Sequence, residues 1–326
     1  MADLDRCAIG VDIGGSKVLA VLLGPEGRVE ATARLATPVS GGADQVVDAV
    51  LAVSAEVAGT AGTAAELPLG VGIPGMVDRS GVARFCPHLH SVDGVDLRAE
   101  LAQPRAPASV TTVLNDATAA CWAEHIAGAG EGFDDMLMVT LGTGIGGGAV
   151  FGGRLVEGAH GFAGEIGHMV IDPHGPPCPC GKRGCWERFA SGSALGRLAR
   201  EAAEAGTLDR VVALAGGDPE AVRGEHVTAA ALAGDRGARA VMENFAWWLA
   251  LGLANLANAL DPAAIVLGGG LMQAGDVVMA PLKRAFAELA EAADARGVEL
   301  RAAALREQSG AIGAAMLARA AAGSPS

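Results

Sequence analysis

Three of the chain's six cysteines lie in one short stretch, CPCGKRGCWE, at residues 178–187. Cys178 and Cys180 are too close along the chain to bridge each other without strain, and a bridge from either to Cys185 leaves one thiol over. The N-terminal MADLDRCAIGVDI lacks the basic start and apolar run of a secretory signal, so we expect a cytoplasmic protein. In a reducing cytosol such a cluster is more often a metal site than a disulfide site, which predicts bound zinc.

A closed structural zinc site needs a fourth ligand besides three thiolates. His174 lies four residues before Cys178, joined to it through two stiff prolines, whereas His168 lies ten residues before it and leaves room for the chain to fold back. Spacing alone leaves both histidines open. Because four protein ligands leave no position for water, we expect this zinc to shape the loop and to perform no hydrolysis.

Two carboxylates flank the predicted ligands. Glu165 lies three residues before His168, and Glu187 lies two residues after Cys185. If zinc holds His168 and Cys185, both carboxylates are carried into one neighbourhood, where they can accept paired hydrogen bonds from the hydroxyls of a sugar. The alternative is two solvated surface glutamates. Their placement on both sides of the ligands favours a polyol pocket.

Asp116 is the candidate general base. A strand pattern at 109–114 runs into Asn115-Asp116 and then into the helical pattern ATAACWAEHIAG. Open α/β sheets place active groups at such junctions, and the dipole of the helix N-terminus favours an ionised carboxylate. The alternative is a simple helix N-cap, a position that aspartate often takes.

Glycine-rich turns follow three predicted strands, in DIGGSK (12–17), LGTGIGGG (141–148) and LGGG (267–270). Glycine lets backbone N–H groups surround phosphate oxygens because no Cβ intrudes. None of the turns matches the Walker pattern or a dinucleotide fingerprint. Tight hairpins also need glycine, but three such turns at strand ends favour a nucleotide site of the type found in actin-like kinases.

The elements that must position these residues include an internal repeat. Residues 7–35 and 136–158 align when Gly14 is set against Gly142, and each copy predicts a β-hairpin followed by a third strand. This predicts a duplicated α/β domain, with chance similarity of glycine-rich turns as the alternative. Further strands are expected at 69–73, 109–114 and 263–270, and helices at 42–59, 193–206, 235–260 and 310–323.

Composition excludes several classes of protein. The chain has 326 residues, 51% of them hydrophobic, which is enough for two domains with their own cores. Its apolar runs are broken by glycine and charge, so we expect no membrane span. The net charge is -13 without a basic block. A nucleic-acid partner is therefore not expected.

With these motifs in hand, the chain resembles the ROK family of repressors and sugar kinases, and within it the zinc-bearing bacterial glucokinases. The resemblance runs nearly end to end and rests on DIGGSK, GIPGMVD, NDATAA, LGTGIGGG, GEIGH, CPCGKRGCWE and VLGGG. It implies an actin-like, ribonuclease-H-like fold with ATP and sugar between two α/β domains. The implied small domain is 1–117, joined by a C-terminal helix at 308–326, and the large domain with the zinc loop is 118–307.

The resemblance also implies roles for individual residues. Asp116 would be the catalytic base for phosphorylation of the 6-hydroxyl of an aldohexose, first of all glucose, with Mg²⁺ accompanying ATP. His168 would be the fourth zinc ligand beside Cys178, Cys180 and Cys185, and would also face the sugar. The implied sugar-binding residues are Gly75, Asn115, Asp116, Glu165, His168 and Glu187. The implied ATP-binding residues are Asp12, Gly14, Gly15, Ser16, Lys17, Gly142, Thr143, Gly144, Gly268, Gly269 and Gly270.

Several positions depart from the family's usual pattern. Leu114 and Thr118 stand where glutamate and asparagine are common, and the segment 86–97 places His88 at an asparagine position beside the sugar site. Fructose, mannose, N-acetylmannosamine or allose therefore remain alternative substrates, and polyphosphate an alternative donor. A non-catalytic sugar sensor or transcriptional regulator is the alternative of another class. The family also implies a homodimer or homotetramer.

Overall fold

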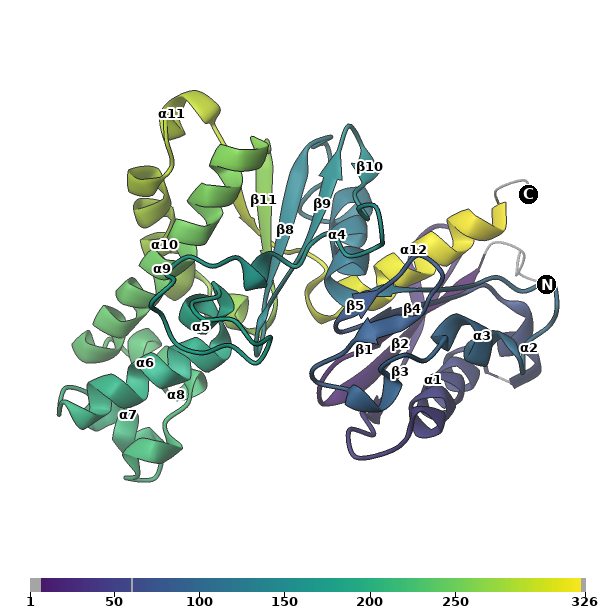
Figure 1. Cartoon of the computed structure of the whole chain (residues 1–326), viewed down its shortest axis with the longest axis horizontal. Helices are drawn as coiled ribbons and strands as arrows, with labels where there is room; N and C mark the ends of the chain where they lie inside the picture. Colours follow the sequence, from purple (N-terminus) through teal and green to yellow (C-terminus); the bar gives the residue numbers. More distant parts are fainter. Residues whose placement is uncertain (1–6, 60, 324–326) are drawn as a thin grey trace. The chain divides into compact units, whose positions relative to one another are not determined.

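The computed structural model describes residues 7–59 and 61–323 (Figure 1). The strands are β1 (Ala8–Ile13), β2 (Lys17–Leu23), β3 (Val29–Ala36), β4 (Leu69–Ile73), β5 (Met76–Val77), β6 (Ala83–Phe85), β7 (Thr111–Asn115), β8 (Met136–Leu141), β9 (Ile145–Phe151), β10 (Arg154–Leu155), β11 (Ala264–Gly268) and β12 (Glu299–Ala302). The helices are α1 (Ala43–Val57), α2 (Ala61–Glu66), α3 (Leu97–Ala102), α4 (Asp116–Ala127), α5 (Glu187–Ala190), α6 (Gly192–Glu204), α7 (Asp209–Leu214), α8 (Gly224–Leu232), α9 (Arg236–Leu260), α10 (Asp276–Leu289), α11 (Ala293–Arg296) and α12 (Ser309–Gly323). Short 3₁₀ turns are η2 (His90–Val92), η3 (Ile166–His168), η4 (Pro219–Ala221), η5 (Gly270–Ala274) and η6 (Arg306–Gln308).

The two large sheets have the same strand order. The first runs β3-β2-β1-β4-β7 and the second β10-β9-β8-β11-β12. In the first sheet β1 is antiparallel to β2 and parallel to β4, which is parallel to β7. In the second, β11 is parallel to both β8 and β12. The predicted internal repeat therefore corresponds to two sheets of one topology, each with an antiparallel hairpin joined to parallel strands.

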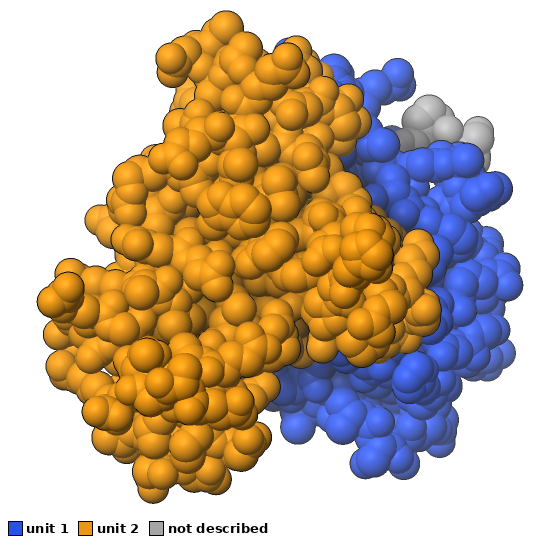
Figure 2. Space-filling model, turned by 60° about the vertical axis from the view of Figure 1, so that its left-hand side comes forward, with its two compact units in different colours: residues 1–134, 148–164, 303–326 blue, residues 135–147, 165–302 orange. Residues whose placement is uncertain are grey.

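The chain divides into two compact units (Figure 2). Unit 1 contains residues 1–134, 148–164 and 303–326, and unit 2 contains residues 135–147 and 165–302. Residues 118–134, 148–164 and 303–307 thus group with unit 1, whereas the boundaries that the resemblance implies place them in the large domain.

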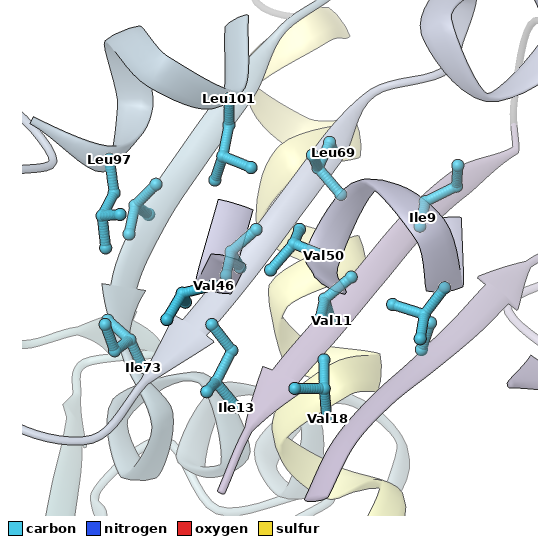
Figure 3. Close-up of a cluster of buried hydrophobic side chains, with 14 of the residues drawn as sticks. Ile9, Val11, Ile13, Val18, Val46, Val50, Leu69, Ile73, Leu97 and Leu101 are labelled. Atoms are coloured by element: carbon cyan, nitrogen blue, oxygen red, sulfur yellow. The ribbon is translucent and has the colours of Figure 1, made fainter. Parts of the chain in front are cut away.

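The core of unit 1 forms between the first sheet and α1. Strand β4 is buried along its whole length, and β1 exposes little of any side chain, as expected for the central strands of a sheet covered on both faces. Helix α1 buries Val46, Val50 and Val53, which recur at helical spacing, in this core. Figure 3 shows Val46 and Val50 among the side chains of the sheet. This packing fixes the sheet whose strand ends carry Asp12 and Asp116.

Helix α12 packs against β1, β4 and α4 in unit 1 (Figure 1, yellow). Ten of its fifteen residues are alanine or glycine, which suits an approach too close for larger side chains. A Cβ on Gly313 would lie 1.8 Å from the carbonyl oxygen of Ala119, and a Cβ on Gly10 would lie 1.8 Å from that of Ala311. The C-terminal helix is therefore an integral layer of unit 1.

The expected elements occur with small shifts at their ends. The strand expected at 69–73 is β4, that at 109–114 is β7, and the helix expected at 235–260 is α9. Helices α3, α7, α8 and α10 and strand β12 were not predicted from the sequence. Within the described residues, no helix is both long and apolar enough to cross a membrane.

Candidate active site

Asp12 and Asp116 lie at the ends of two strands of the first sheet that are separated by one strand. Asp12 is near the end of β1, and Asp116 follows β7 as the first residue of α4, with β4 between the two strands. The residue that separates them on β4 is Gly72. A Cβ there would lie 3.3 Å from the Cα of Asp116 and 3.7 Å from Oδ1 of Asp12. The absence of a side chain at this position leaves the two acids facing one small space.

Burial raises the pKa of both carboxyl groups. Asp12 is affected first by loss of solvent and then by the charge of Asp116, which together raise its pKa to about 7, while Lys17 acts in the opposite sense. The pKa of Asp116 is raised mainly by burial and lowered in part by the Ala117 amide, which donates to its Oδ1 at 2.8 Å. A buried carboxyl pair with raised pKa values is suited to holding and accepting a proton near neutral pH.

Asn115 and Gly75, predicted to bind sugar, contact each other. Asn115 caps α4 through Oδ1, which accepts from the Thr118 amide at 2.9 Å. Its Nδ2 donates to the carbonyl oxygen of Gly75 at 3.1 Å. A Cβ on Gly75 would lie 2.4 Å from the carbonyl oxygen of Phe85. The chain entering the divergent segment 86–97 therefore packs directly on the backbone beside Asn115.

The four predicted zinc ligands converge in unit 2. The nitrogen and sulfur atoms that His168, Cys178, Cys180 and Cys185 offer all lie within 4.8 Å of one another. Cys178 Sγ lies 3.7 Å from His168 Nδ1, and Cys180 Sγ lies 3.6 Å from Cys185 Sγ. Tetrahedral Zn²⁺ with Zn–S bonds of about 2.3 Å separates its ligand atoms by about 3.8 Å. The donor set and its spacing fit tetrahedral zinc.

His168 and not His174 belongs to this cluster. His174 is exposed, and its backbone amide donates to Asp172. Burial raises the pKa of the Cys178 and Cys185 thiols, so a bound cation is what would hold them as thiolates. These observations agree with the ligand choice that the family resemblance implies.

Glu165 and Glu187 both lie beside His168. Glu165 Oε2 is 3.8 Å from His168 Nε2, and Glu187 Oε1 is 3.6 Å from His168 Nδ1. Glu187 is the first residue of α5, directly after the cysteine loop, and Glu165 precedes η3, which ends at His168. Folding thus gathers the two flanking carboxylates around one imidazole, as their spacing predicted.

The second glycine-rich turn borders a large cavity in unit 2, with a volume of about 820 Å³. Gly142, Thr143 and Gly270 line it, together with residues of α6, α8 and η5. Gly269 instead makes a close backbone approach, because a Cβ there would lie 2.4 Å from the carbonyl oxygen of Leu141. The cavity also has lining residues that the sequence analysis missed: Ser193, Arg200, Arg223, Glu225, Thr228 and Gln273.

The first glycine-rich turn lies in unit 1. The amide of Gly14 donates to the carbonyl oxygen of Lys17 at 2.8 Å and closes the turn, while Gly15 has open space around its Cα. Ser16 accepts through its carbonyl oxygen from the amide of Thr37. The Lys17 ammonium pairs with Glu307 at 2.5 Å, so in this structure it serves an ion pair within unit 1.

An actin-like pair of sheets, a buried acid at a strand end and a glycine-lined cavity define a phosphotransferase of the actin-like ATPase fold. The chain belongs to the ROK family, whose model matches residues 8–321. It is 37% identical to a glucokinase of Streptomyces coelicolor, over 95% of this chain and 97% of that one. It is 33% identical to an N-acetylmannosamine kinase of Shigella boydii, over 95% and 98% of the two chains.

A solved structure of similar fold is the ROK family glucokinase from Streptomyces griseus in complex with glucose and AMPPNP. Its TM-score is 0.85 at 36% sequence identity, covering 96% of this chain and 99% of that chain. The comparisons confirm three predictions made from the sequence: the ROK family, the actin-like fold and a hexokinase-type enzyme.

Proposed function

We propose that this protein transfers the γ-phosphoryl group of ATP to the 6-hydroxyl of glucose. The observation that carries the proposal is the half-buried Asp116 carboxylate at the start of α4, directly after Asn115, whose Nδ2 donates to the Gly75 carbonyl oxygen. The glucokinases among the relatives give the substrate class. Their glucose- and AMPPNP-bound representative gives the pair of ligands.

The residues divide the reaction between them. Asp116 accepts the proton of the 6-hydroxyl as the phosphoryl group leaves ATP. Asn115, Gly75, Glu165, Glu187 and the Nε2 edge of His168 orient the sugar through its hydroxyls. The cavity bordered by Gly142, Thr143 and Gly270 holds the adenosine, and the turn of Gly14 to Lys17 faces the phosphates. Because the transition state of phosphoryl transfer is loose, this alignment supplies most of the catalysis.

Two metals belong to the proposal. Zn²⁺ would be held by His168 and the three cysteines, with no ligand position left for water, and would keep Glu187 and His168 together. Mg²⁺ would accompany ATP and neutralise phosphate charge, with Asp12, at the end of β1 before the first glycine-rich turn, as the acid in unit 1 to receive it. Neither ion replaces Asp116 as proton acceptor.

The test is a panel of hexoses offered with ATP and Mg²⁺, with the phosphorylated sugar as readout. We expect glucose to give the highest kcat/KM, ahead of mannose, fructose, allose and N-acetylmannosamine. Polyphosphate in place of ATP tests the donor. Preference for N-acetylmannosamine would replace glucose by N-acetylmannosamine as the proposed substrate. Phosphorylation of no hexose would overturn the kinase proposal in favour of a sugar sensor.

We also propose a cytoplasmic homodimer or homotetramer without a nucleic-acid partner. The acidic net charge of -13 supports the last point. Light scattering of the purified protein measures the oligomer.

A further inference from the structure

Glu124 is a fully buried carboxylate outside the groups assigned to substrate binding. It lies on α4 with no exposed surface. Its Oε2 accepts from the amides of Ala129 at 2.8 Å and Ala304 at 3.0 Å. Its Oε1 accepts from the amide of Leu305 at 2.8 Å and from the hydroxyl of Ser309 at 2.9 Å. Four donors thus fill the lone-pair positions of one carboxylate, the arrangement that keeps such a buried charge stable.

The partners of Glu124 lie where the chain passes between the two units. These passages follow residues 134, 147, 164 and 302. Ala129 is in the turn that leads from α4 to the first passage, and Ala304 and Leu305 come directly after the last. A single carboxylate therefore ties down, within unit 1, the ends of two inter-unit connections that are far apart in sequence.

A second acid, Glu307, fixes the segment 304–309 by ion pairs to the first sheet. Glu307, in η6, pairs with Lys17 of β2 and with Arg34 of β3. Between the two anchors, Arg306 has a left-handed backbone with φ of 54°. A non-glycine residue keeps such a conformation only where its surroundings fix it. Residues 304–309 are thus fixed on unit 1 at both ends and do not form a flexible linker.

The position of Asp12 relative to Asp116 depends on the contacts of Glu124. Asp116 is the first residue of α4, the helix that carries Glu124. Ser309, which donates to Glu124, is the first residue of α12, and the next residue abuts Asp12: a Cβ on Gly310 would lie 2.8 Å from the Asp12 Cγ. A shift of residues 304–309 would consequently move the start of α12 against Asp12, while Asp116 stays with α4.

We propose that Glu124 is a positioning residue for phosphoryl transfer, acting as the anchor on unit 1 for two connections between the units. The inference rests on the proposed kinase function. When the units move during the catalytic cycle, the anchor confines bending to residues outside the turn at Ala129 and the segment 304–309. The alignment of Asp12 with Asp116 is thereby kept through the motion.

The chemistry of the site explains why glutamate is required. All four partners are donors, so a glutamine in place of Glu124 directs an NH₂ group at two of them and keeps only one oxygen for the others. The neighbouring Gly128 is fitted to the same carboxylate, because a Cβ there would lie 2.1 Å from Glu124 Oε2. Glu124→Gln therefore breaks the anchor while changing little in size.

The test compares Glu124→Gln with the wild type and with Val50→Ala, a matched destabilising control in the buried α1 core that touches neither connection. Three quantities are measured: kcat for glucose, the Kd for AMPPNP, and backbone amide exchange without substrates. We expect Glu124→Gln to lower kcat at least tenfold and to raise the AMPPNP Kd threefold or less, because the cavity beside Gly142 lies wholly in unit 2 and only the phosphate-facing turn of Gly14 to Lys17 belongs to unit 1. Exchange should rise at 129–134 and 303–309 but not in β1 and β4.

Val50→Ala should keep kcat within twofold at 25 °C even if its unfolding midpoint falls further. If Glu124→Gln does not fold, Ser309→Ala removes one of the four bonds, and the same pattern is expected at threefold or more in kcat. Unchanged kcat, or exchange that rises equally across β1 and β4, overturns the proposal. Exchange and AMPPNP binding need no turnover, so an inactive wild type would contradict the kinase function and not the anchor.

Discussion

The first and second sheets share one strand order but differ in what stands at their strand ends. Where β1 carries Asp12, the aligned position of β8 is Thr140. The residue after β7 is Asp116, and the residue after its counterpart β12 is Ala303. The acids belong to the first copy alone. The second copy is instead followed by the cysteine loop and by the helices that line the large cavity.

The two glycine-rich turns are also held differently. The turn of unit 1 is fixed by charge, through the contact of Lys17 with Glu307. In unit 2, the Gly142 carbonyl accepts from the amide of Gly192 at 2.8 Å, at the start of α6, and a Cβ on Gly144 would lie 2.6 Å from Glu187 Oε2. Under the proposed function the two copies differ in role: the first carries the proton acceptor, and the second borders the cavity assigned to adenosine.

The largest effect is expected from removing the base of the first copy. Asp116→Asn should lower kcat by about 10³-fold, within the usual range for loss of a general base, because the amide cannot accept the hydroxyl proton. Glucose Kd, measured by calorimetry, should stay within a few-fold. Thr140→Val, at the second copy's position aligned with Asp12, is the control and should retain kcat. An Asp116→Asn enzyme with wild-type turnover would place the base elsewhere.

The next largest effect should come from the metal cluster of unit 2. Cys180→Ser should lose stoichiometric zinc, measured by atomic absorption, and its unfolding midpoint should fall by about 10 °C, since a structural zinc site contributes directly to folding. Cys121→Ala, outside the cluster, should keep its zinc. Zinc bound equally by Cys180→Ser would remove this residue from the ligand set.

A smaller effect concerns the acid of the first turn. The pKa of Asp12 is raised from its ordinary 3.8 to about 7 in the folded protein. Between these values the folded state holds a proton that the unfolded state has released, so this group's contribution to stability falls as pH rises from about 4 to 7. Asp12→Asn removes the cost of burying a charge.

Its unfolding midpoint should therefore exceed that of the wild type by several degrees at pH 8 and match it near pH 4. Calorimetry across this range measures the difference between the two midpoints. For the control Thr140→Val, which keeps Asp12, the difference from the wild type should not change with pH. A gap that widens toward acid pH would contradict the raised pKa.

The smallest effect should follow from adding one methyl group to each turn. Gly144→Ala should displace the Glu187 carboxylate and raise the glucose KM a few-fold. Gly15→Ala should leave the glucose KM unchanged, because a Cβ there meets nothing within 4 Å. Steady-state kinetics with glucose varied at saturating ATP measures both. Equal glucose KM values in the two variants would show that Glu187 does not bind the sugar.

Local patterns predicted much of the framework. The repeat could be recognised because both copies must form the same tight hairpin. Cys178, Cys180 and Cys185 predicted a metal cluster because they lie close in sequence. Spacing could not choose between His168 and His174, since the choice depends on how the loop folds back. The family resemblance made that choice.

Other parts of the site had no sequence signal. Arg200, Arg223 and Thr228 line the large cavity from helices α6 and α8, where isolated polar residues look like any solvated face. Glu124 reads as a surface glutamate within a helix, because its partner Ala304 is 180 residues away. Lys17 was predicted to face ATP, and that remains a prediction beside its observed pairing with Glu307.

The place of α12 has a consequence for biosynthesis. Strand β1 of unit 1 leaves the ribosome long before α12, the alanine- and glycine-rich helix that packs against it. The first sheet must therefore wait for the synthesis of α12 before its second face is covered, while every segment of unit 2 is already available. A nascent chain stalled just short of Ser309 would present an open sheet face, and with it a target for chaperones or aggregation.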